Sequence, residues 1–392
     1  MLRILVALII PLSLLALLEV TIVRSISSLQ EGYLWTYLGI SVLGYIGGVL
    51  AITTRTNRPI DRPRMTNLLV GWSFIALVQK IVLLLLLLLV VISSYLLSDA
   101  SVEIAKLVVF WVSLMVVAAM LYGITYGKYR YVVEEQDVFF SDLPRALDGL
   151  KVIQISDIHA GTWDNVAGVQ KGIDLIKAQD PDLILFTGDL VNGNKDEIDP
   201  FIHLFASLKA THGKYAVLGN HDYYGQPRER ELRPAYYEDL YRKYEDMGFD
   251  LINNDSRYID IGGERLYIAG VENWGHGKYF PKRGDIDKAM INVPEEAFTI
   301  LMSHDPSHWD LHVKNHRRKI PLTLSGHTHG MQFGINLPFL KWSPVQYRYK
   351  HWMGLYESEG RRLYVNRGFG LLAYPGRVGM SPEVTVLHFR KG

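Results

Sequence analysis

Four long apolar segments near the amino terminus restrict most strongly what this chain can fold into. They cover residues 2–23, 33–53, 68–97 and 104–126, and the third contains an uninterrupted aliphatic run from Val82 to Ile92. A helix needs about 20 apolar residues to cross the hydrocarbon core of a membrane, a run that soluble cores rarely contain. The sequence therefore predicts an all-α, multi-span transmembrane domain of about four helices over residues 1–127.

The flanks of these segments predict the orientation of the chain. Arg3 precedes the first apolar run, as in a signal peptide, but no small-residue cleavage site follows it, which favours an uncleaved anchor. The second connection and the stretch after the last segment are rich in basic residues, namely Arg55, Arg58, Arg62, Arg64, Lys128 and Arg130. Because basic loops stay on the cytoplasmic side, we expect the amino terminus and everything after residue 127 to be cytoplasmic.

Titratable side chains are distributed unevenly along the chain. Residues 1–127 contain only 13 of the 81 charged residues and none of the 13 histidines, so chemistry that needs such groups must lie in the second part. The net charge of +1 gives no general attraction to nucleic acid, and we expect no nucleic-acid partner. The lack of cysteine excludes disulfides, thiolate metal sites and cysteine nucleophiles.

The second part has the pattern of an α/β domain. Residues 128–148 are interpreted as a connector, and from residue 149 to 392 short apolar runs alternate with polar, helix-compatible stretches. The expected strands cover residues 151–155, 183–187, 214–218, 265–269, 299–302, 321–324, 363–365 and 383–389. Residues 223–247 are expected to form a loop that leads into a helix.

Six of these strands end at or near a polar motif. In chain order the motifs are Asp157-Ile158-His159, Gly188-Asp189, Gly219-Asn220-His221-Asp222, Gly270-Val271-Glu272-Asn273, Ser303-His304-Asp305 and Gly326-His327-Thr328-His329. Open α/β sheets bind ligands beyond the carboxyl ends of their strands, so these distant residues are expected to converge.

The converging side chains are of the kinds that hold metal ions. Imidazoles, carboxylates and one amide offer mixed nitrogen and oxygen donors, which suit Mn, Fe, Zn or Co better than Ca or Mg. Two divalent cations about 3.5 to 4 Å apart need such a set, with one carboxylate between them. Each motif alone is weak, since Asp-x-His and Gly-Asp are common in turns, but their joint order favours a two-metal site.

This ordered set of motifs resembles the calcineurin-like metallophosphoesterase superfamily over about residues 149–392. The resemblance implies a four-layer α/β sandwich. It also implies a division of the ligands, in which Asp157, His159 and His329 hold one metal, Asn220, His304 and His327 hold the other, and Asp189 bridges them. His221 belongs to the motif in a role other than ligand, and we expect it to protonate the leaving group.

Further motifs are similar to a bacterial subgroup with amino-terminal targeting or membrane segments. They are Met353-Gly354-Leu355-Tyr356, Leu363-Tyr364-Val365-Asn366-Arg367-Gly368 and Pro382-Glu383-Val384. We therefore expect a multi-pass protein of a bacterial inner membrane. The subgroup usually has a second glycine after its His-x-His-Gly motif, where this chain has Met331. This difference leaves the conformation of the loop at the pocket undecided, but it does not affect the expected metal binding.

Three further residues have alternative interpretations. Asp222 would orient His221 or cap the next helix. Arg367 would contact a substrate phosphate through its bidentate guanidinium or satisfy a loop carbonyl, and His276 is a candidate for the pocket rim. The aromatic and basic stretch from Trp342 to Trp352 would suit a membrane interface or ordinary packing.

The expected function is a membrane-anchored, di-metal phosphoester hydrolase that uses a metal-bridging hydroxide to attack phosphorus. The expected substrate is a phosphodiester or pyrophosphate, and location alone suggests a lipid-linked one. Membrane-associated relatives implied by the resemblance include pyrophosphatases of UDP-2,3-diacylglucosamine in lipid A synthesis. The alternatives are a phosphatase of soluble esters, an inactive membrane sensor or scaffold, and a transporter with a regulatory domain. The transporter is supported only by Lys80, because an ionisable residue within a membrane segment often marks a transport pathway.

Overall fold

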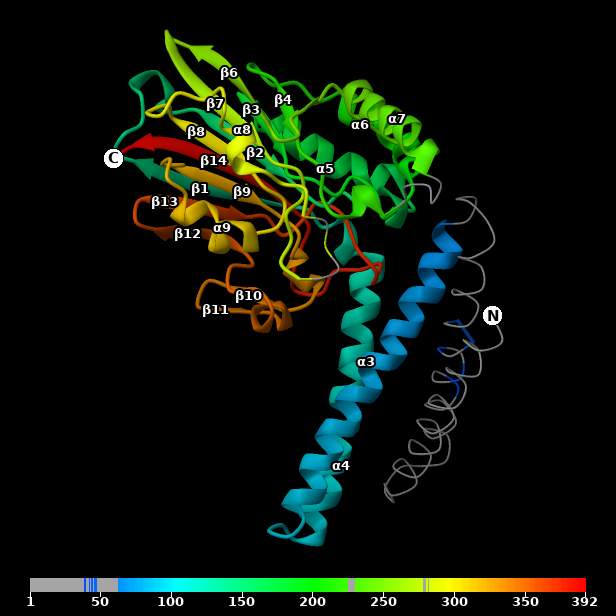
Figure 1. Cartoon of the computed structure of the whole chain (residues 1–392). Coiled ribbons are helices and arrows are strands. Elements are labelled where there is room, and N and C mark those ends of the chain that lie inside the picture. Colours follow the sequence, from blue (N-terminus) through cyan, green and yellow to red (C-terminus); the bar gives the residue numbers. More distant parts are fainter. Residues whose placement is uncertain are drawn as a thin grey trace. The chain divides into compact units, whose positions relative to one another are not determined.

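The chain divides into two compact units (Figure 1). One unit holds Met1–Tyr126 together with Ala373–Gly376, and the other holds Gly127–Leu372 with Arg377–Gly392. The computed structural model describes residues 63–224, 230–277, 280 and 282–392, and five helical positions between residues 39 and 47. The expected span 2–23 and, apart from those five positions, the span 33–53 lie outside the described residues.

Two long apolar helices form most of the described part of the first unit. Helix α3 spans Pro63–Ser93 and α4 spans Asp99–Thr125, close to the predicted segments 68–97 and 104–126. Their side chains pack against each other through Leu83, Leu87, Val90 and Val109. By length and composition, both helices are able to cross a membrane.

Two six-stranded sheets form the body of the second unit. The first has the order β1-β14-β2-β3-β4-β5, with β1 at Val132–Phe140, β2 at Lys151–Ile155, β3 at Leu183–Phe186, β4 at Lys214–Ala216, β5 at Asp250–Leu251 and β14 at Glu383–Lys391. The second has the order β12-β13-β9-β8-β7-β6, with β6 at Asp255–Ile261, β7 at Glu264–Gly270, β8 at Thr299–Met302, β9 at Leu322–Ser325, β12 at Gly354–Ser358 and β13 at Arg361–Val365. Both sheets are mixed. In the first, β2, β3, β4 and β5 run parallel, and β14 pairs antiparallel with β2. In the second, β7, β8, β9 and β13 run parallel, whereas the edge strands β6 and β12 pair antiparallel with their neighbours.

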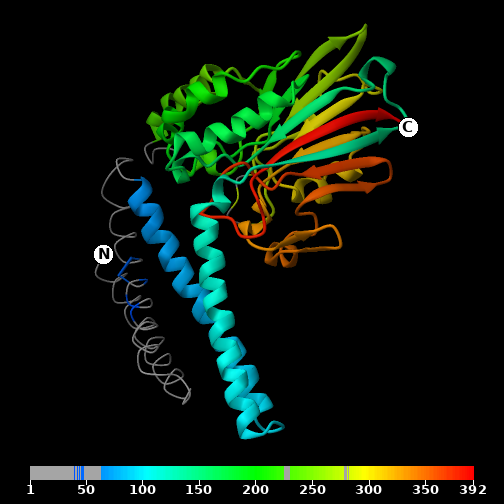
Figure 2. The same cartoon turned by 180° about the vertical axis from the view of Figure 1, so that it is seen from behind.

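Helices cover the outer face of each sheet (Figures 1 and 2). Against the first sheet lie α5 at Val166–Ala178, α6 at Ile202–Ala206 and α7 at Arg233–Asp246, and against the second lie α8 at Ile286–Ala289 and α9 at Ser307–Leu311. A third apolar core, with Val152, Leu185, Ile268 and Ile300, fills the space between the two sheets. The second unit is therefore ordered as helices, sheet, sheet and helices.

The central strands are apolar because both of their faces are buried. All four residues of β3, β8 and β9 are buried, which is the environment that continuous Val, Ile and Leu runs predict for parallel strands. All eight strands expected from the sequence are present, with ends that differ by a few residues, and α7 lies within the stretch 223–247.

The structure corrects the interpretation of residues 128–148 as a connector. They contain β1, which pairs in parallel with β14 along its whole length. The strand lies at the sheet edge, and its Glu134-Glu135-Gln136-Asp137 stretch is half exposed. Charged side chains are common on edge strands, where they discourage pairing with other chains, and they conceal the strand from a search for apolar runs.

Candidate metal centre

The polar motifs meet where strand ends from both sheets converge. Strands β2, β3 and β4 of the first sheet end before Asp157, Asp189 and Asn220, and strands β8 and β9 of the second end before His304 and His327. The sequence predicted convergence beyond the carboxyl ends of the strands, and the structure shows that the strand ends of two facing sheets take part.

The backbone at this edge is left-handed at five of the predicted ligands. Positive φ angles occur at Asp157 (53°), His159 (46°), Asp189 (63°), His327 (70°) and His329 (53°). Such angles are uncommon for residues other than glycine, and they concentrate at functional sites where the surrounding structure enforces them. Strands β2, β3 and β9 are thus followed by sharp turns that present these side chains at the shared edge.

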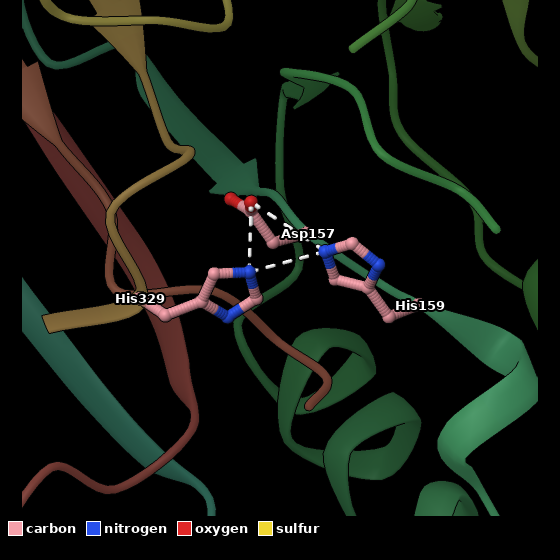
Figure 3. Close-up of side chains that lie close together, drawn as sticks. All are labelled: Asp157, His159 and His329. Carbon is pink, nitrogen blue, oxygen red and sulfur yellow. Dashed lines mark hydrogen bonds and ion pairs between the residues drawn. The ribbon is translucent and has the colours of Figure 1, made fainter. Parts of the chain in front are cut away.

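Asp157, His159 and His329 form the first cluster (Figure 3). The two histidine Nε2 atoms are 3.1 Å apart, and Asp157 Oδ1 lies 3.2 Å from His329 Nε2 and 3.9 Å from His159 Nε2. Ligand atoms about 2.0 to 2.2 Å from one cation lie roughly 3 to 3.5 Å from one another. Two sides of the triangle, 3.1 and 3.2 Å, have this length and the third, 3.9 Å, is somewhat longer. All three side chains are buried.

The second cluster is formed by Asn220, His304 and His327. Atom Nε2 of His304 lies 3.2 Å from Asn220 Oδ1 and 3.2 Å from His327 Nδ1. The set again combines oxygen with nitrogen donors and has the spacing of ligands around one cation.

Asp189 lies between the two clusters. Its Oδ2 is 3.4 Å from His159 Nε2 in the first cluster and 3.2 Å from His304 Nε2 in the second. Its other oxygen, Oδ1, accepts a hydrogen bond of 2.7 Å from the backbone N–H of His221. One carboxylate oxygen is thereby fixed by the backbone while the other faces both clusters.

Hydrogen bonds fix which nitrogen of two histidines faces the centre. His304 Nδ1 is 2.8 Å from the carbonyl of Thr187, and its donation there leaves the lone pair on Nε2 for the cluster. His327 Nε2 is 2.7 Å from the hydroxyl of Tyr349, which leaves Nδ1 for the cluster. Partners of this kind orient metal-ligating histidines and raise their basicity.

Two motif glycines are required because the loops touch at these points. A Cβ at Gly219 would lie 2.2 Å from Asp189 Oδ1, and a Cβ at Gly326 would lie 2.3 Å from Asp157 Oδ2. The chain departs from the subgroup at Met331, where the backbone keeps a φ of 53°. The turn that a glycine favours there is thus formed by methionine.

The electrostatics of the centre favour bound cations. Burial opposes ionisation of Asp157, but the neighbouring His329 outweighs it and lowers the pKa of the carboxyl group. Burial likewise opposes the charge on His304, yet Asp189 outweighs it and raises the pKa of the imidazole to about 10. Without a metal this ring is therefore in its cationic form, with a proton on each nitrogen. Burial lowers the pKa values of His159 and His327, which keeps both rings neutral and able to coordinate.

His221 lies beside the first cluster. Its ring is 4.8 Å from that of His159, edge to face, and its Nδ1 is 2.9 Å from the carbonyl of Asn192. With Nδ1 donating to that carbonyl, Nε2 is the nitrogen available for proton transfer. The ring is only partly buried, in contrast to that of His159.

Asp222 neither orients the ring of His221 nor caps a helix. Its carboxylate accepts backbone N–H groups from Asp189 at 3.1 Å, Leu190 at 2.9 Å and Gly219 at 2.8 Å, so it joins the loops after β3 and β4. Burial and the charge of Asp189 raise the pKa of Asp222 to about 7. This role was missed because two of these three partners, Asp189 and Leu190, lie 33 and 32 residues away along the chain.

The structure gives no support for a substrate contact by Arg367. Its side chain is buried, and its guanidinium group pairs with Glu383 and Glu134. The sequence predicted either a substrate phosphate or a loop carbonyl as the partner of Arg367. The structure pairs it with two carboxylates instead. His276 is exposed, and its backbone N–H bonds the hydroxyl of Ser307 at 3.2 Å.

Arg377 is a further buried residue near the centre that sequence reasoning missed. Its guanidinium donates to the carbonyls of Gly368 and Gly370 and, at 3.4 Å, to that of His329. Burial lowers the pKa of Arg377 to about 9. The residue lies outside every motif, and its contacts are all with backbone, so the sequence carried no signal of it.

Comparison with known proteins decides the family. A family model described as calcineurin-like phosphoesterase matches residues 150–331. The uncharacterized metallophosphoesterase YkuE of Bacillus subtilis is 30% identical over 284 residues, which cover 68% of this chain and 91% of the relative. The chain belongs to the calcineurin-like phosphoesterase family.

Other members of the family are similar over comparable lengths. An uncharacterized metallophosphoesterase of Campylobacter jejuni is 27% identical over 74% of this chain and 72% of its own length. A transmembrane protein with metallophosphoesterase domain of Danio rerio is 26% identical over 69% of this chain and 60% of its own length. The protein is thus a metal-dependent phosphoesterase, and its two buried His/Asp clusters fit the dimetal requirement of the family.

Proposed function

We propose that this phosphoesterase hydrolyses its substrate at two divalent cations held by seven residues. Asp157, His159 and His329 would hold one cation, and Asn220, His304 and His327 would hold the other. The single observation that carries the proposal is the position of Asp189, whose Oδ2 is within 3.4 Å of a histidine nitrogen of each cluster. A carboxylate oxygen so placed can serve both cations.

The donor set supports Mn, Fe or Zn as the cations. It contains imidazole nitrogens and carboxylate or amide oxygens without sulfur, which does not favour Ca or Mg. When bound, two such cations lower the pKa of water and neutralise charge on phosphoryl oxygens.

His221 is proposed as the general acid for the leaving oxygen. Its Nδ1 is held by the carbonyl of Asn192 at 2.9 Å, so in the protonated ring Nε2 carries the proton to be transferred. Its backbone N–H also anchors Asp189, which fixes the distance between the acid and the bridging carboxylate. Proton transfer by such a group contributes typically about 10²- to 10⁴-fold.

A membrane location, which we propose together with the catalytic site, would favour a substrate that contains lipid. Helices α3 and α4 are long and apolar enough to cross a bilayer, and the Danio rerio relative is named as a transmembrane protein. We propose a multi-pass protein of a bacterial inner membrane with its hydrolase unit in the cytoplasm, acting on a lipid-linked phosphodiester or pyrophosphate. A UDP-2,3-diacylglucosamine-like substrate is one member of this class.

Hydrolysis of bis(p-nitrophenyl) phosphate by the detergent-solubilised, full-length protein tests the enzyme mechanism. We expect Mn²⁺-dependent release of p-nitrophenol that is lost in Asp189→Ala and reduced in His221→Ala. Equal rates in all three proteins would refute the proposed site.

A lipid extract tests the substrate class. The protein with Mn²⁺ is incubated with the extract, and mass spectrometry follows the loss of phosphoester groups, with Asp189→Ala as the inactive control. Loss of one lipid species with wild type only supports a lipid-linked substrate. Cleavage of soluble esters without any lipid product would replace it with a phosphatase of soluble esters.

A further inference from the structure

A two-stranded ribbon stands apart from both large sheets and exposes an apolar face. Among the described residues, strands β10 (Ile335–Leu337) and β11 (Leu340–Trp342) pair only with each other, and they project from the second unit in both views (Figures 1 and 2). Residues 331–350, which include this ribbon, are called the basic hairpin below.

The strand register puts the apolar side chains on one face. Ile335 lies opposite Trp342, and Leu337 lies opposite Leu340. Partners across an antiparallel pair share a face, as do residues two apart along a strand, so these four side chains line the same face. The pair between Asn336 and Lys341 occupies the other face.

This apolar face is open to solvent. The large apolar and aromatic side chains of the hairpin that are exposed by at least two fifths are Met331 (57%), Ile335 (40%), Leu337 (44%), Phe339 (84%), Leu340 (44%) and Tyr347 (80%). Phe339 is at the turn between the strands, where it is more exposed than any other large apolar side chain described from residue 127 onward. Large apolar side chains that stay exposed together on one face of a ribbon are typical of an interaction site.

The charges of the hairpin identify the chemistry of its partner. Lys341, Arg348 and Lys350 are exposed, and none of them makes an ion pair with the described residues. The sequence has no acidic residue between Asp310 and Glu357. Arg348 also lies over the Tyr349 ring, 6.0 Å from its centre. Apolar and aromatic side chains flanked by cations that make no ion pair with the described residues suit an anionic lipid surface, where the rings enter the acyl boundary and the cations meet the phosphates.

The base of the hairpin is joined to the metal centre. The hairpin follows His329 and Gly330 directly, and the Ser343 hydroxyl bonds the Gly330 carbonyl at 2.8 Å. Tyr349, near its end, bonds the ligand His327. A surface that holds the hairpin therefore lies next to the loop that supplies two of the predicted ligands.

We propose that the basic hairpin inserts Phe339 and its apolar face into the anionic lipid surface of the membrane. The proposal rests on the membrane attachment proposed above, but it does not depend on catalysis. Its consequence is that the hairpin, together with the apolar helices, sets the position of the metal centre relative to lipid headgroups.

The lack of cysteine allows a direct test in the full-length protein. Phe339→Cys is labelled with an environment-sensitive fluorophore and reconstituted in nanodiscs of phosphatidylcholine and phosphatidylglycerol that carry a spin-label quencher on the acyl chains. Ile291→Cys, at a position that is 71% exposed and follows α8, is the matched control. We expect several-fold stronger quenching at position 339 than at position 291.

The charge part of the proposal has its own variant. Replacing the three cations by Lys341→Glu, Arg348→Glu and Lys350→Glu together should lower the quenching at position 339, as should discs of phosphatidylcholine alone or raised salt. Equal quenching at positions 339 and 291 would overturn the proposal. So would a probe at 339 that is shielded from aqueous iodide in detergent but not quenched by lipid, because a protein partner or a second copy would then cover the hairpin.

These readouts stay separate from the proposed function. Quenching at position 339 is measured without substrate, and hydrolysis of bis(p-nitrophenyl) phosphate is measured on the same samples. Quenching without hydrolysis would refute the enzyme mechanism and leave the lipid contact standing, whereas hydrolysis without quenching would do the reverse.

Discussion

Replacing Asp222 by asparagine removes acceptors from the backbone that carries two of the proposed ligands. Oδ2 of Asp222 accepts the N–H groups of Asp189 and Gly219, and Oδ1 accepts those of Leu190 and Val191. An asparagine keeps one oxygen, and its amide group directs hydrogens at the other pair of donors. Whichever way the amide turns, two buried N–H groups lose their acceptor.

The expected cost follows from that count. A buried donor left without a partner costs about 1 to 3 kcal/mol, so Asp222→Asn should reduce the free energy of unfolding of the second unit by about 2 to 6 kcal/mol. The loops that place Asp189 and Asn220 would also loosen, and losses of this kind typically lower metal affinity by about 10- to 100-fold. Thermal unfolding with EDTA and with Mn²⁺ measures both effects.

The assay is run at pH 8, because burial and Asp189 raise the pKa of Asp222 to about 7 and a protonated carboxyl group would itself resemble the amide. Asp174→Asn is the matched control, since Asp174 is exposed on α5 and bonds only the Gln170 side chain among the described residues. It should change stability by less than about 0.5 kcal/mol. If Asp222→Asn matched this control in both unfolding temperature and Mn²⁺ affinity, the role assigned to Asp222 would be wrong.

Three further substitutions probe the centre at separate points. Gly219→Ala places a Cβ 2.2 Å from Asp189 Oδ1, so bound metal measured by elemental analysis should fall, and full metal content would contradict the close packing. His221→Gln should keep the metal content and lower kcat by about 10²- to 10⁴-fold for esters with poor leaving groups. It should lower kcat much less for p-nitrophenyl esters, because their leaving group needs little protonation. Equal losses for both kinds of ester would exclude the acid role. Tyr349→Phe removes the hydroxyl 2.7 Å from His327 Nε2 and should weaken Mn²⁺ binding by about 10-fold in calorimetric titration, whereas unchanged binding would show that this hydrogen bond does not orient the ring.

The sequence predicted the central strands and the convergence of the motifs well. Strands such as β3 and β8 are buried on both faces, so their apolar runs stand out, and Gly-Asp or His-x-His motifs at strand ends point to a shared edge. The long aliphatic run in α3 made that helix equally clear. Local composition was sufficient wherever the environment was uniformly apolar.

Features that depend on distant contacts were not predictable. Strand β1 contains the polar stretch Glu134-Glu135-Gln136-Asp137 and is recognisable only through its pairing with β14. The carboxylate pairing of Arg367 joins it to Glu134, which is far away in sequence. The sequence pointed to the proposed ligands because these residue types themselves carry the chemistry. The groups that bond two of them, the Thr187 carbonyl and the Tyr349 hydroxyl, are brought there only by the fold.

Metal content together with hydrolysis tests the central claim most directly. The full-length protein is loaded with Mn²⁺, and bound metal per chain is measured for wild type, Asp189→Ala and Asn220→Ala, with bis(p-nitrophenyl) phosphate hydrolysis on the same samples. Because Asp189 lies between the two clusters and Asn220 belongs to one, we expect two ions in wild type, loss of both in Asp189→Ala, and loss of one in Asn220→Ala. Hydrolysis should require both ions. Wild-type metal content and hydrolysis in Asp189→Ala would contradict the account.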